Sequence, residues 1–358
     1  MTERHYYLGL DTSAYTTSAA VVDEQGNLVW ETRKVLDVPL KETGLAQSAA
    51  FFQHIQNLPG LTDALPPEIW RDLRAVGVSV TPRPVPGSYM PVFTAGTAAA
   101  RMIAAARELP LFQTTHQEGH IAAGLATASS LAREPFLAVH LSGGTTELLR
   151  IQCLGAGKIQ IERLGGTTDL HAGQFIDRVG VRLGTPFPAG KHLERLASEA
   201  SPEAASWLPS SVKGLEVSFS GVETAAARLL AQGKGKADVA RAVEGCIART
   251  VAKLILRGKK DTGRRKVLIV GGVAANQFIR QEIVRRVENM EFYWAKPELS
   301  SDNAVGVALL TKEGNERRGG IVGWEKDREN VEGRNPQRGG SLEGERRDPK
   351  FGGGDGGG

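Results

Sequence analysis

Residues 136–166 of the chain read FLAVHLSGGTTELLRIQCLGAGKIQIERLGG. An apolar strand is followed by a small polar turn, a second apolar strand, a glycine turn and a third strand. Residues 6–13, YYLGLDTS, are an apolar run that ends in small hydroxyl residues, and residues 17–36, TSAAVVDEQGNLVWETRKVL, indicate two strands joined at residues 25–27. The sequence therefore contains two copies of a three-stranded unit.

Helical patterns follow each copy. Apolar residues recur at a spacing near 3.6 in residues 92–109, and again in residues 175–184 and 192–200. Two three-stranded units, each followed by helices, predict a duplicated α/β fold with two lobes and a cleft between them. We expect a first lobe at 1–135, with a helix at 298–316 packing back on it, and a second lobe at 136–297.

The composition is that of an ordinary globular protein. The 358 residues include 44 Lys or Arg and 40 Asp or Glu, for a net charge of +4, and 41% are hydrophobic. These values argue against wholesale disorder and against a membrane-spanning bundle. The charged, glycine-rich residues 317–358 predict a disordered tail. Two cysteines, together with an N-terminal stretch lacking an apolar signal segment, predict a cytoplasmic protein.

Three loops of glycine or hydroxyl residues each follow an apolar strand. They are Asp11 to Ser13, Ser142 to Thr146, and Gly271 with Gly272. Such loops let backbone N–H groups approach anionic oxygen closely, so their joint occurrence predicts nucleotide binding. None is a Walker A or GxGxxG loop. In the first loop we assign Asp11 and Ser13 as catalytic candidates.

A histidine pair lies at the start of another helical pattern. His116 and His120 are four residues apart in THQEGHIAAGLA, a spacing that places both imidazoles on one helix face. Such a pair either shares a metal or consists of surface or packed histidines. Glu118 does not complete an HExxH motif, so the base of a zinc protease is missing. Asp302, at the start of a late helix, is the candidate third ligand, and a carboxylate suits iron or zinc.

Other polar residues allow two interpretations each. Asp177 could bind a ribose hydroxyl or pair with Arg178, and Asp169 could reach the cleft or act as an N-cap. The basic run at 257–266 is either a solvated loop or a phosphate contact. There is no GxSxG elbow, which leaves nucleophilic hydrolysis without support. Cys153 and Cys246 lie in apolar contexts and are expected in the core.

Several ordered motifs together resemble the TsaD/Gcp family of tRNA threonylcarbamoyladenosine-forming transferases, over nearly all of residues 7–312. The motifs are HQEGH at 116–120, LSGGTTEL at 141–148, AGQFIDRVGVRLGTPFPAG at 172–190, SFSGVETA at 218–225, GGVAANQFIR at 271–280 and SDNA at 301–304. The resemblance implies a two-lobed actin/sugar-kinase/Hsp70-like fold built from two ribonuclease-H-like lobes.

The resemblance also implies an activity. Family members transfer a threonylcarbamoyl group from its adenylate to the N6 amine of the tRNA adenosine next to the anticodon, together with partner proteins. By resemblance, one iron or zinc ion would be held by His116, His120 and Asp302. The adenylate-type substrate, or ATP, would be bound by Leu141, Ser142, Gly143, Gly144, Thr145, Asp177, Gly190 and Asn276, to which we add Gly271 and Gly272 from their loop.

The chain also departs from the family pattern, as a divergent paralogue would. Tyr15 and Thr16 stand where the first loop usually has acids, Thr145 stands where a histidine follows the Ser-Gly-Gly, and Gln174 replaces a glutamate. The Gly-Pro-Gly segment has become residues 82–87, PRPVPG. Two alternative functions follow. One is a nucleotide-binding, non-catalytic scaffold of a tRNA-modification complex, and the other is a carbamoyl transferase or ATPase acting on a small molecule.

Overall fold

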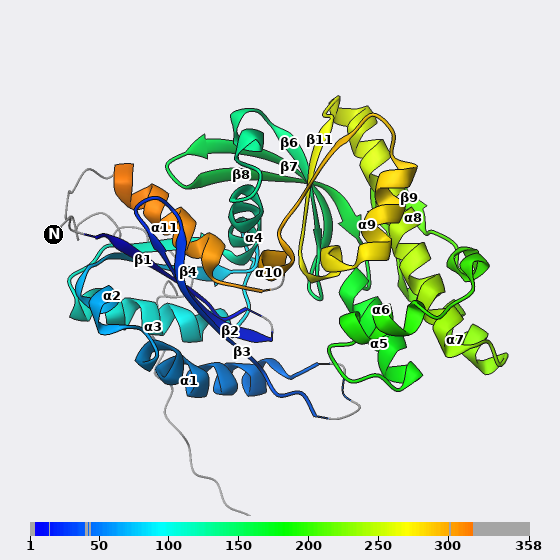
Figure 1. The fold of residues 1–358 in the computed structure, drawn as a ribbon, viewed down its shortest axis with the longest axis horizontal. Helices are drawn as coiled ribbons and strands as arrows, with labels where there is room; N and C mark the ends of the chain where they lie inside the picture. The colour runs from blue at the N-terminus through cyan, green and yellow to red at the C-terminus, as the bar shows by residue number, and fades with distance from the viewer. Residues whose placement is uncertain (1–3, 14, 40–41, 43, 301, 318–358) are drawn as a thin grey trace, which may run out of the picture. The chain divides into compact units, whose positions relative to one another are not determined.

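The computed structural model describes residues 4–13, 15–39, 42, 44–300 and 302–317 (Figure 1). The predicted disordered tail at 317–358 therefore lies outside the described residues, apart from Arg317. So do Ala14 of the first loop and Ser301 of the SDNA motif.

The first three predicted strands form the centre and one edge of a five-stranded sheet with the order β3-β2-β1-β4-β5. Its strands are β1 (Tyr6–Asp11), β2 (Thr16–Asp23), β3 (Leu28–Val35), β4 (Leu73–Thr81) and β5 (Leu111–Thr115). β1 pairs antiparallel with β2 and β2 with β3, whereas β4 and β5 run parallel to β1. Every residue of β1 is buried, as expected of a strand covered on both faces.

Helices cover both faces of this sheet. On one face lie α1 (Gln47–Asp63) and α3 (Phe93–Ala106), with α2 (Pro67–Arg71) before β4. The other face is covered by α11 (Val305–Arg317), which returns from the end of the described chain and packs on β1, β2 and β4. α11 also packs on α4 (His116–Leu125) (Figure 1).

The second copy of the three-stranded unit belongs to a seven-stranded sheet with the order β12-β11-β6-β7-β8-β10-β9. The strands are β6 (Phe136–Leu141), β7 (Thr146–Gly155), β8 (Lys158–Thr167), β9 (Val212–Lys213), β10 (Glu216–Val217), β11 (Lys266–Val270) and β12 (Glu291–Trp294). β6, β7 and β8 are antiparallel neighbours, so the predicted duplication is confirmed in both sheets.

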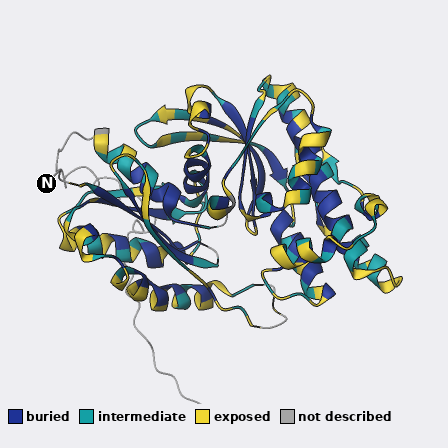
Figure 2. Cartoon of the chain, in the orientation of Figure 1, coloured by how far each residue is buried: buried dark blue, intermediate teal, exposed yellow. Residues whose placement is uncertain are grey.

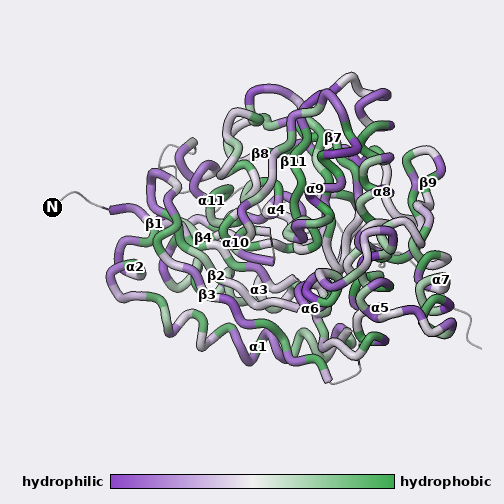
Figure 3. Tube along the Cα trace, turned by 45° about the vertical axis from the view of Figure 1, so that its right-hand side comes forward, coloured by the Kyte–Doolittle hydropathy of each residue, from purple (hydrophilic) through white to green (hydrophobic). Residues whose placement is uncertain are grey.

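Alternating residues of the second sheet enter two cores. Leu137, Val139 and Ile269 pack with α5 (Ala172–Leu183), α6 (Gly190–Ala197), α7 (Ser220–Ala231), α8 (Lys236–Thr262) and α9 (Gln277–Arg286). Phe136, Leu268 and Val270 point the other way, toward Ile121 of α4. Figure 2 shows these strands as buried and the outer faces of the helices as exposed. Figure 3 colours the same chain by hydropathy, from hydrophilic to hydrophobic residues.

Short elements complete the order: η1 (Ser129–Arg133), η2 (Pro202–Ser206), η3 (Gly272–Ala275) and α10 (Pro297–Ser300). The predicted helices at 92–109, 175–184 and 192–200 are α3, α5 and α6. Of the two cysteines expected in the core, Cys246 is buried and Cys153 is only partly buried. Within the described residues, no helix is long and apolar enough to span a membrane. The division into lobes at 1–135 and 136–297 stays a prediction.

Candidate metal centre and its neighbouring loops

The N-terminus of α4 carries both histidines of the HQEGH motif. Thr115 caps this helix, since its hydroxyl accepts from Glu118 N at 3.2 Å while Glu118 accepts from Thr115 N at 2.8 Å. Glu118 is therefore a capping residue, facing away from the histidine pair. The helical spacing brings His116 Nε2 within 3.1 Å of His120 Nε2.

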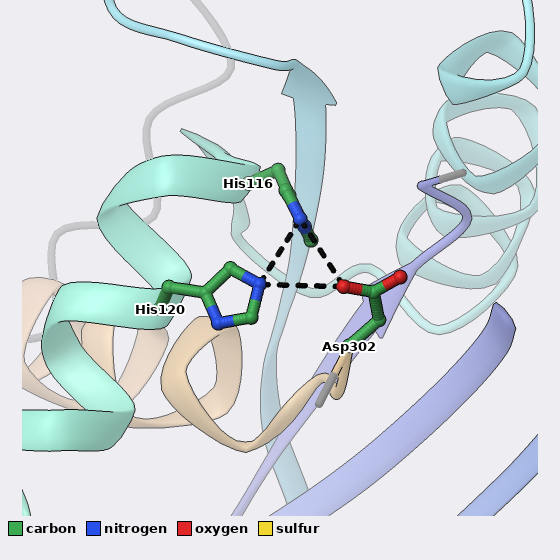
Figure 4. Close-up of side chains that lie close together, drawn as sticks. All are labelled: His116, His120 and Asp302. Carbon is green, nitrogen blue, oxygen red and sulfur yellow. Dashed lines mark hydrogen bonds and ion pairs between the residues drawn. The ribbon is translucent and has the colours of Figure 1, made fainter. Parts of the chain in front are cut away.

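Asp302 approaches the same pair from the segment between α10 and α11. Its Oδ1 lies 3.6 Å from His116 Nε2 and 3.4 Å from His120 Nε2 (Figure 4). One ligand atom from each of the three residues lies within 4.8 Å of the other two, and this is the only such group of His, Cys, Asp or Glu among the described residues. Two imidazoles and a carboxylate are a donor set for iron or zinc.

Asp11, at the end of β1, holds the other nitrogen of His116. Its Oδ2 lies 3.0 Å from His116 Nδ1, and its Oδ1 accepts from Ser13 N at 2.8 Å. Burial opposes ionisation of both groups, but their mutual attraction dominates: it lowers the pKa of Asp11 and raises the pKa of His116. Ser13 lies beside them, and its hydroxyl is buried without a hydrogen-bond partner in the described structure.

A third histidine, which the sequence analysis did not single out, packs against the pair. His140 of β6 is fully buried, and its ring centroid lies 4.7 Å from that of His120. Neither ring nitrogen has a hydrogen-bond partner within the described chain. Burial, followed by the charges of His120 and His116, holds the pKa of His140 well below its usual value. A histidine inside the apolar run FLAVHL was the signal for it in the sequence.

The loop between β6 and β7 contains the next group of predicted residues. Ser142 N donates to Thr145 O at 2.8 Å, and Gly144 N donates to Ser142 Oγ at 3.3 Å, which closes a tight turn. Leu141 has a fully buried side chain, so it offers the loop only its backbone. A Cβ on Gly143 or Gly144 would meet nothing within 4 Å, so the loop borders open space.

The N-terminus of α5 packs directly against this loop. Gly173 N donates to Ser142 O at 3.1 Å, and a Cβ on Gly173 would lie 2.7 Å from Gly143 Cα. Further along α5, Asp177 accepts from Ala189 N at 2.7 Å, next to Gly190 at the start of α6. Burial is the main cause that raises the pKa of Asp177 to about 6.

The two interpretations of Asp177 and Asp169 can now be compared with their contacts. The Arg178 guanidinium lies 3.9 Å from Glu223, and Asp177 instead binds the Ala189 amide. Asp169 accepts from Phe219 N at 2.8 Å and from the hydroxyls of Ser218 and Ser220. Burial acts to raise the pKa of Asp169, but these hydrogen bonds outweigh burial and lower the pKa. Asp169 therefore fixes the loop before α7.

The loop after β11 contains the last two predicted glycines. Gly271 precedes the 3-10 helix η3, Gly272 is its first residue, and α9 begins only at Gln277. Asn276 is the N-cap: its side chain accepts from Ile279 N at 2.8 Å and donates to the buried Glu244 at 2.6 Å. The glycines therefore do not open α9 directly, because the helix takes its cap four residues after Gly272.

In the basic run at 257–266, three cations are held by the protein. Arg257 donates to Gly214 O, Lys259 to Glu288 O, and Lys266 pairs with Glu134. Residues 257–262 form the end of α8, so only 263–265 are the predicted loop before β11. The three contacts favour a structural role of these cations over a phosphate contact. A shallow hollow of about 380 Å³ remains beside the end of α8, lined by Leu256, Lys259, Lys260, Gly263 and Arg265.

Comparison with known proteins identifies the family. Residues 42–309 match the model of the TsaD family, described as tRNA N6-adenosine threonylcarbamoyltransferase. The chain belongs to this family. Proteins of that name from Thermus thermophilus and Methanopyrus kandleri are 32% and 30% identical to this TsaD-family chain. The matches cover 85% and 84% of the chain, and 91% and 85% of the two relatives.

Solved structures resemble this TsaD-family chain in fold. Full-length HypF in its phosphate- and nucleotide-bound form gives a TM-score of 0.56 at 14% identity, covering 90% of this chain and 56% of HypF. The Clostridium difficile activator of 2-hydroxyisocaproyl-CoA dehydratase, with bound ADPNP, gives 0.51 at 15%, covering 88% and 97%. The predicted two-lobed actin/sugar-kinase/Hsp70-like fold class is confirmed.

Proposed function

We propose that this protein transfers a threonylcarbamoyl group from threonylcarbamoyl-adenylate to the N6 amine of the tRNA adenosine next to the anticodon, assisted by partner proteins. In this reaction N6 bonds to the carbamoyl carbon, the bond from that carbon to the adenylate oxygen breaks, AMP leaves, and N6 loses a proton. The observation that carries the proposal is the convergence of His116, His120 and Asp302 in a chain of the TsaD family.

The three residues fit a divalent ion, iron or zinc. Both imidazoles direct Nε2 toward the Asp302 carboxylate, and Asp11 binds Nδ1 of His116. A carboxylate on the far nitrogen fixes the ring and its tautomer, which is the usual support of a metal-binding histidine. When bound, the ion would polarise the acyl oxygen and stabilise the charge that develops there. We infer that Asp11 is a positioning residue that acts through His116.

The glycines of the predicted donor site support a ligand that comes close to the backbone. Gly143, Gly144, Gly190 and Gly272 all have negative or extended φ, and a Cβ on any of them would meet nothing within 4 Å. Neither backbone strain nor crowding requires glycine there, and the open space beside these backbones leaves room for a ligand to approach closely. Gly271 is different, because its φ is +97° and a Cβ would lie 2.3 Å from Leu141 O.

We assign the donor to these loops, with Leu141, Ser142, Thr145, Asp177 and Asn276 as further residues of the site. Backbone amides of the β6–β7 loop other than those of Ser142 and Gly144, together with those at residues 271–272, would orient the adenylate. The adenine amine is a poor nucleophile, so holding it against the acyl carbon must supply much of the rate acceleration. The buried Ser13 hydroxyl stays our candidate for a direct contact with the reacting groups.

The test is a single-turnover reaction of the purified chain with threonylcarbamoyl-adenylate and unmodified tRNA, with partner proteins added. We expect modified adenosine by mass spectrometry, and its loss on chelation. No product with partners present would contradict the transferase.

Metal content provides a readout that does not depend on activity. We expect the double variant His116→Ala, His120→Ala to lose bound iron or zinc in elemental analysis, because two of three ligands are gone. His192→Ala, which removes an exposed histidine of α6, is the matched control and should keep the ion. Unchanged metal in the double variant would refute the site.

The scaffold is the second candidate, and one contact favours it. The ring of Tyr15, which stands at an acid position of the family, packs edge-on against Phe187 with centroids 5.2 Å apart. This first-loop side chain is thus engaged in apolar packing. A scaffold would bind the adenylate without turnover, whereas a small-molecule carbamoyl transferase or ATPase would turn over without regard to tRNA. Measuring AMP release from the adenylate and phosphate release from ATP, each with and without tRNA, separates the three.

A further inference from the structure

The segment after β4 holds an arginine beside the β6–β7 loop. Pro82 and Pro84 flank Arg83 and restrict the backbone on both sides. Arg83 N donates to Ser88 Oγ at 3.1 Å, Thr81 Oγ1 donates to Arg83 O at 3.2 Å, and Gln117 N donates to Pro82 O at 3.1 Å. The backbone that carries this guanidinium is therefore fixed by three hydrogen bonds.

The side chain of Arg83 extends to Glu147 and Gly144. Its Nε lies 3.4 Å from Glu147 Oε1, and its Nη2 donates to Gly144 O at 3.4 Å. About a third of the side chain is exposed. The Nε is buried, yet it makes no hydrogen bond within the described residues. The guanidinium thus borders the open space over Gly143 and Gly144. Its hydrogen bond to Gly144 O is long, and its Nε makes none.

Charge around Glu147 is unbalanced. Its carboxylate is 4% exposed, accepts from Gln117 Nε2 at 2.8 Å and from Arg163 Nε at 3.1 Å, and also faces Arg83. Two guanidiniums share one carboxylate, which leaves one positive charge beside the loop. The pKa of His171, at the start of α5, is lowered mainly by burial and secondly by the charge of Arg83. This surplus faces the predicted donor site.

We propose that Arg83 recognises an oxyanion of the acyl donor, seated over Gly143 and Gly144, with Glu147 holding the guanidinium in place. This inference rests on the proposed function. A planar guanidinium pairs well with carboxylate and with phosphate, the two anionic groups of threonylcarbamoyl-adenylate. Arg83 is thus a specificity-determining residue: it selects donors that carry an anion at this position over uncharged nucleosides.

Calorimetric binding of adenosine, AMP and threonylcarbamoyl-adenylate to the full chain tests the inference. Arg83→Met keeps the side chain's length and removes its charge. If the oxyanion is the phosphate, we expect AMP and the acyl-adenylate to bind about ten- to a hundredfold more weakly, with adenosine unchanged. If it is the threonyl carboxylate, only the acyl-adenylate weakens.

Two matched variants sharpen the result. Arg163 binds the same carboxylate but, among the described residues, does not hydrogen-bond Gly144. Arg163→Met should therefore leave all three affinities within about twofold. Arg83→Lys keeps the charge but lacks the planar guanidinium, and its affinity for the anionic ligands should fall less than that of Arg83→Met. A thermal midpoint for each variant verifies folding.

Two outcomes would overturn the role of Arg83 but leave the proposed function standing. In one, Arg83→Met binds all the ligands as tightly as the wild type; in the other, its affinities for adenosine and for the anionic ligands fall equally. A wild-type chain that binds none of the three ligands overturns the donor site of the proposed function and this inference with it.

Discussion

At the scale of the residue, Asp177 combines a buried carboxyl group with a predicted role in substrate binding. Its pKa is raised to about 6, chiefly by burial, while the hydrogen bond from Ala189 N acts in the opposite direction. The carboxyl is therefore protonated in the fold at a pH where the unfolded chain has already ionised. The stability that this difference contributes is present below pH 4 and is lost as the pH rises to about 6.

Replacing the Asp177 carboxyl by an uncharged amide should remove this loss of stability at higher pH. We expect Asp177→Asn to match the wild type in free energy of unfolding near pH 4, and to exceed it by on the order of 2 kcal/mol at pH 8. The amide oxygen still accepts from Ala189 N, so the helix junction is kept. Denaturant unfolding at both pH values measures the difference. A variant that is less stable at pH 8 would mean that a cation stabilises the ionised carboxylate.

At the scale of the element, the cap of α4 determines how firmly the first histidine is held. His116 is the first residue of the helix, and the reciprocal bonds of Thr115 and Glu118 satisfy amides at this end. The candidate metal centre therefore depends on a local signal, TTHQE, as well as on its ligands.

We expect Thr115→Ala to cost about 1 kcal/mol of unfolding free energy and to weaken metal binding, because the first turn frays. Thr115→Ser keeps the accepting oxygen and should restore both. Denaturant unfolding and metal titration of the chelated protein provide the two readouts. If Ser behaved like Ala, the cap would not be the cause.

At the scale of the whole molecule, the site depends on close packing of α11 against α4. A Cβ on Gly306 would lie 1.8 Å from Gly119 O, so only glycine lets the two backbones meet here. Asp302 precedes α11, and His116 and His120 lie on α4. The distance between these helices therefore controls the spacing of the three ligands.

We expect Gly306→Ala to destabilise the protein by about 2 kcal/mol or more and to reduce metal retention. Gly60→Ala is the control. Gly60 lies in α1, and a Cβ there would meet nothing within 4 Å, so this substitution should be neutral or stabilise the protein by up to about 1 kcal/mol. Thermal unfolding and elemental analysis of both variants test this. Equal behaviour of the two would contradict the close packing.

Local sequence patterns specify the duplicated three-stranded unit, the helices that follow it and the spacing of His116 and His120. These features depend on local patterns, namely alternation in strands, glycine turns and helical periodicity, which any segment carries with it. Patterns of this kind also predicted the glycine and hydroxyl loops and Asp302, and the family motifs added Leu141, Asp177, Gly190 and Asn276 as expected substrate contacts. The pattern did not locate the start of α9, which the Asn276 cap places at Gln277.

Only the tertiary structure brought Asp11 to His116, His140 to His120, and Arg83 to Glu147 and Gly144. These partners lie on the helix α4 and on different strands and loops, and no local pattern links them. Their distances follow from how two sheets pack around α4 and from glycines that allow backbones to touch. Charge balance at the site is likewise a property of that packing, because it depends on which side chains share a buried carboxylate.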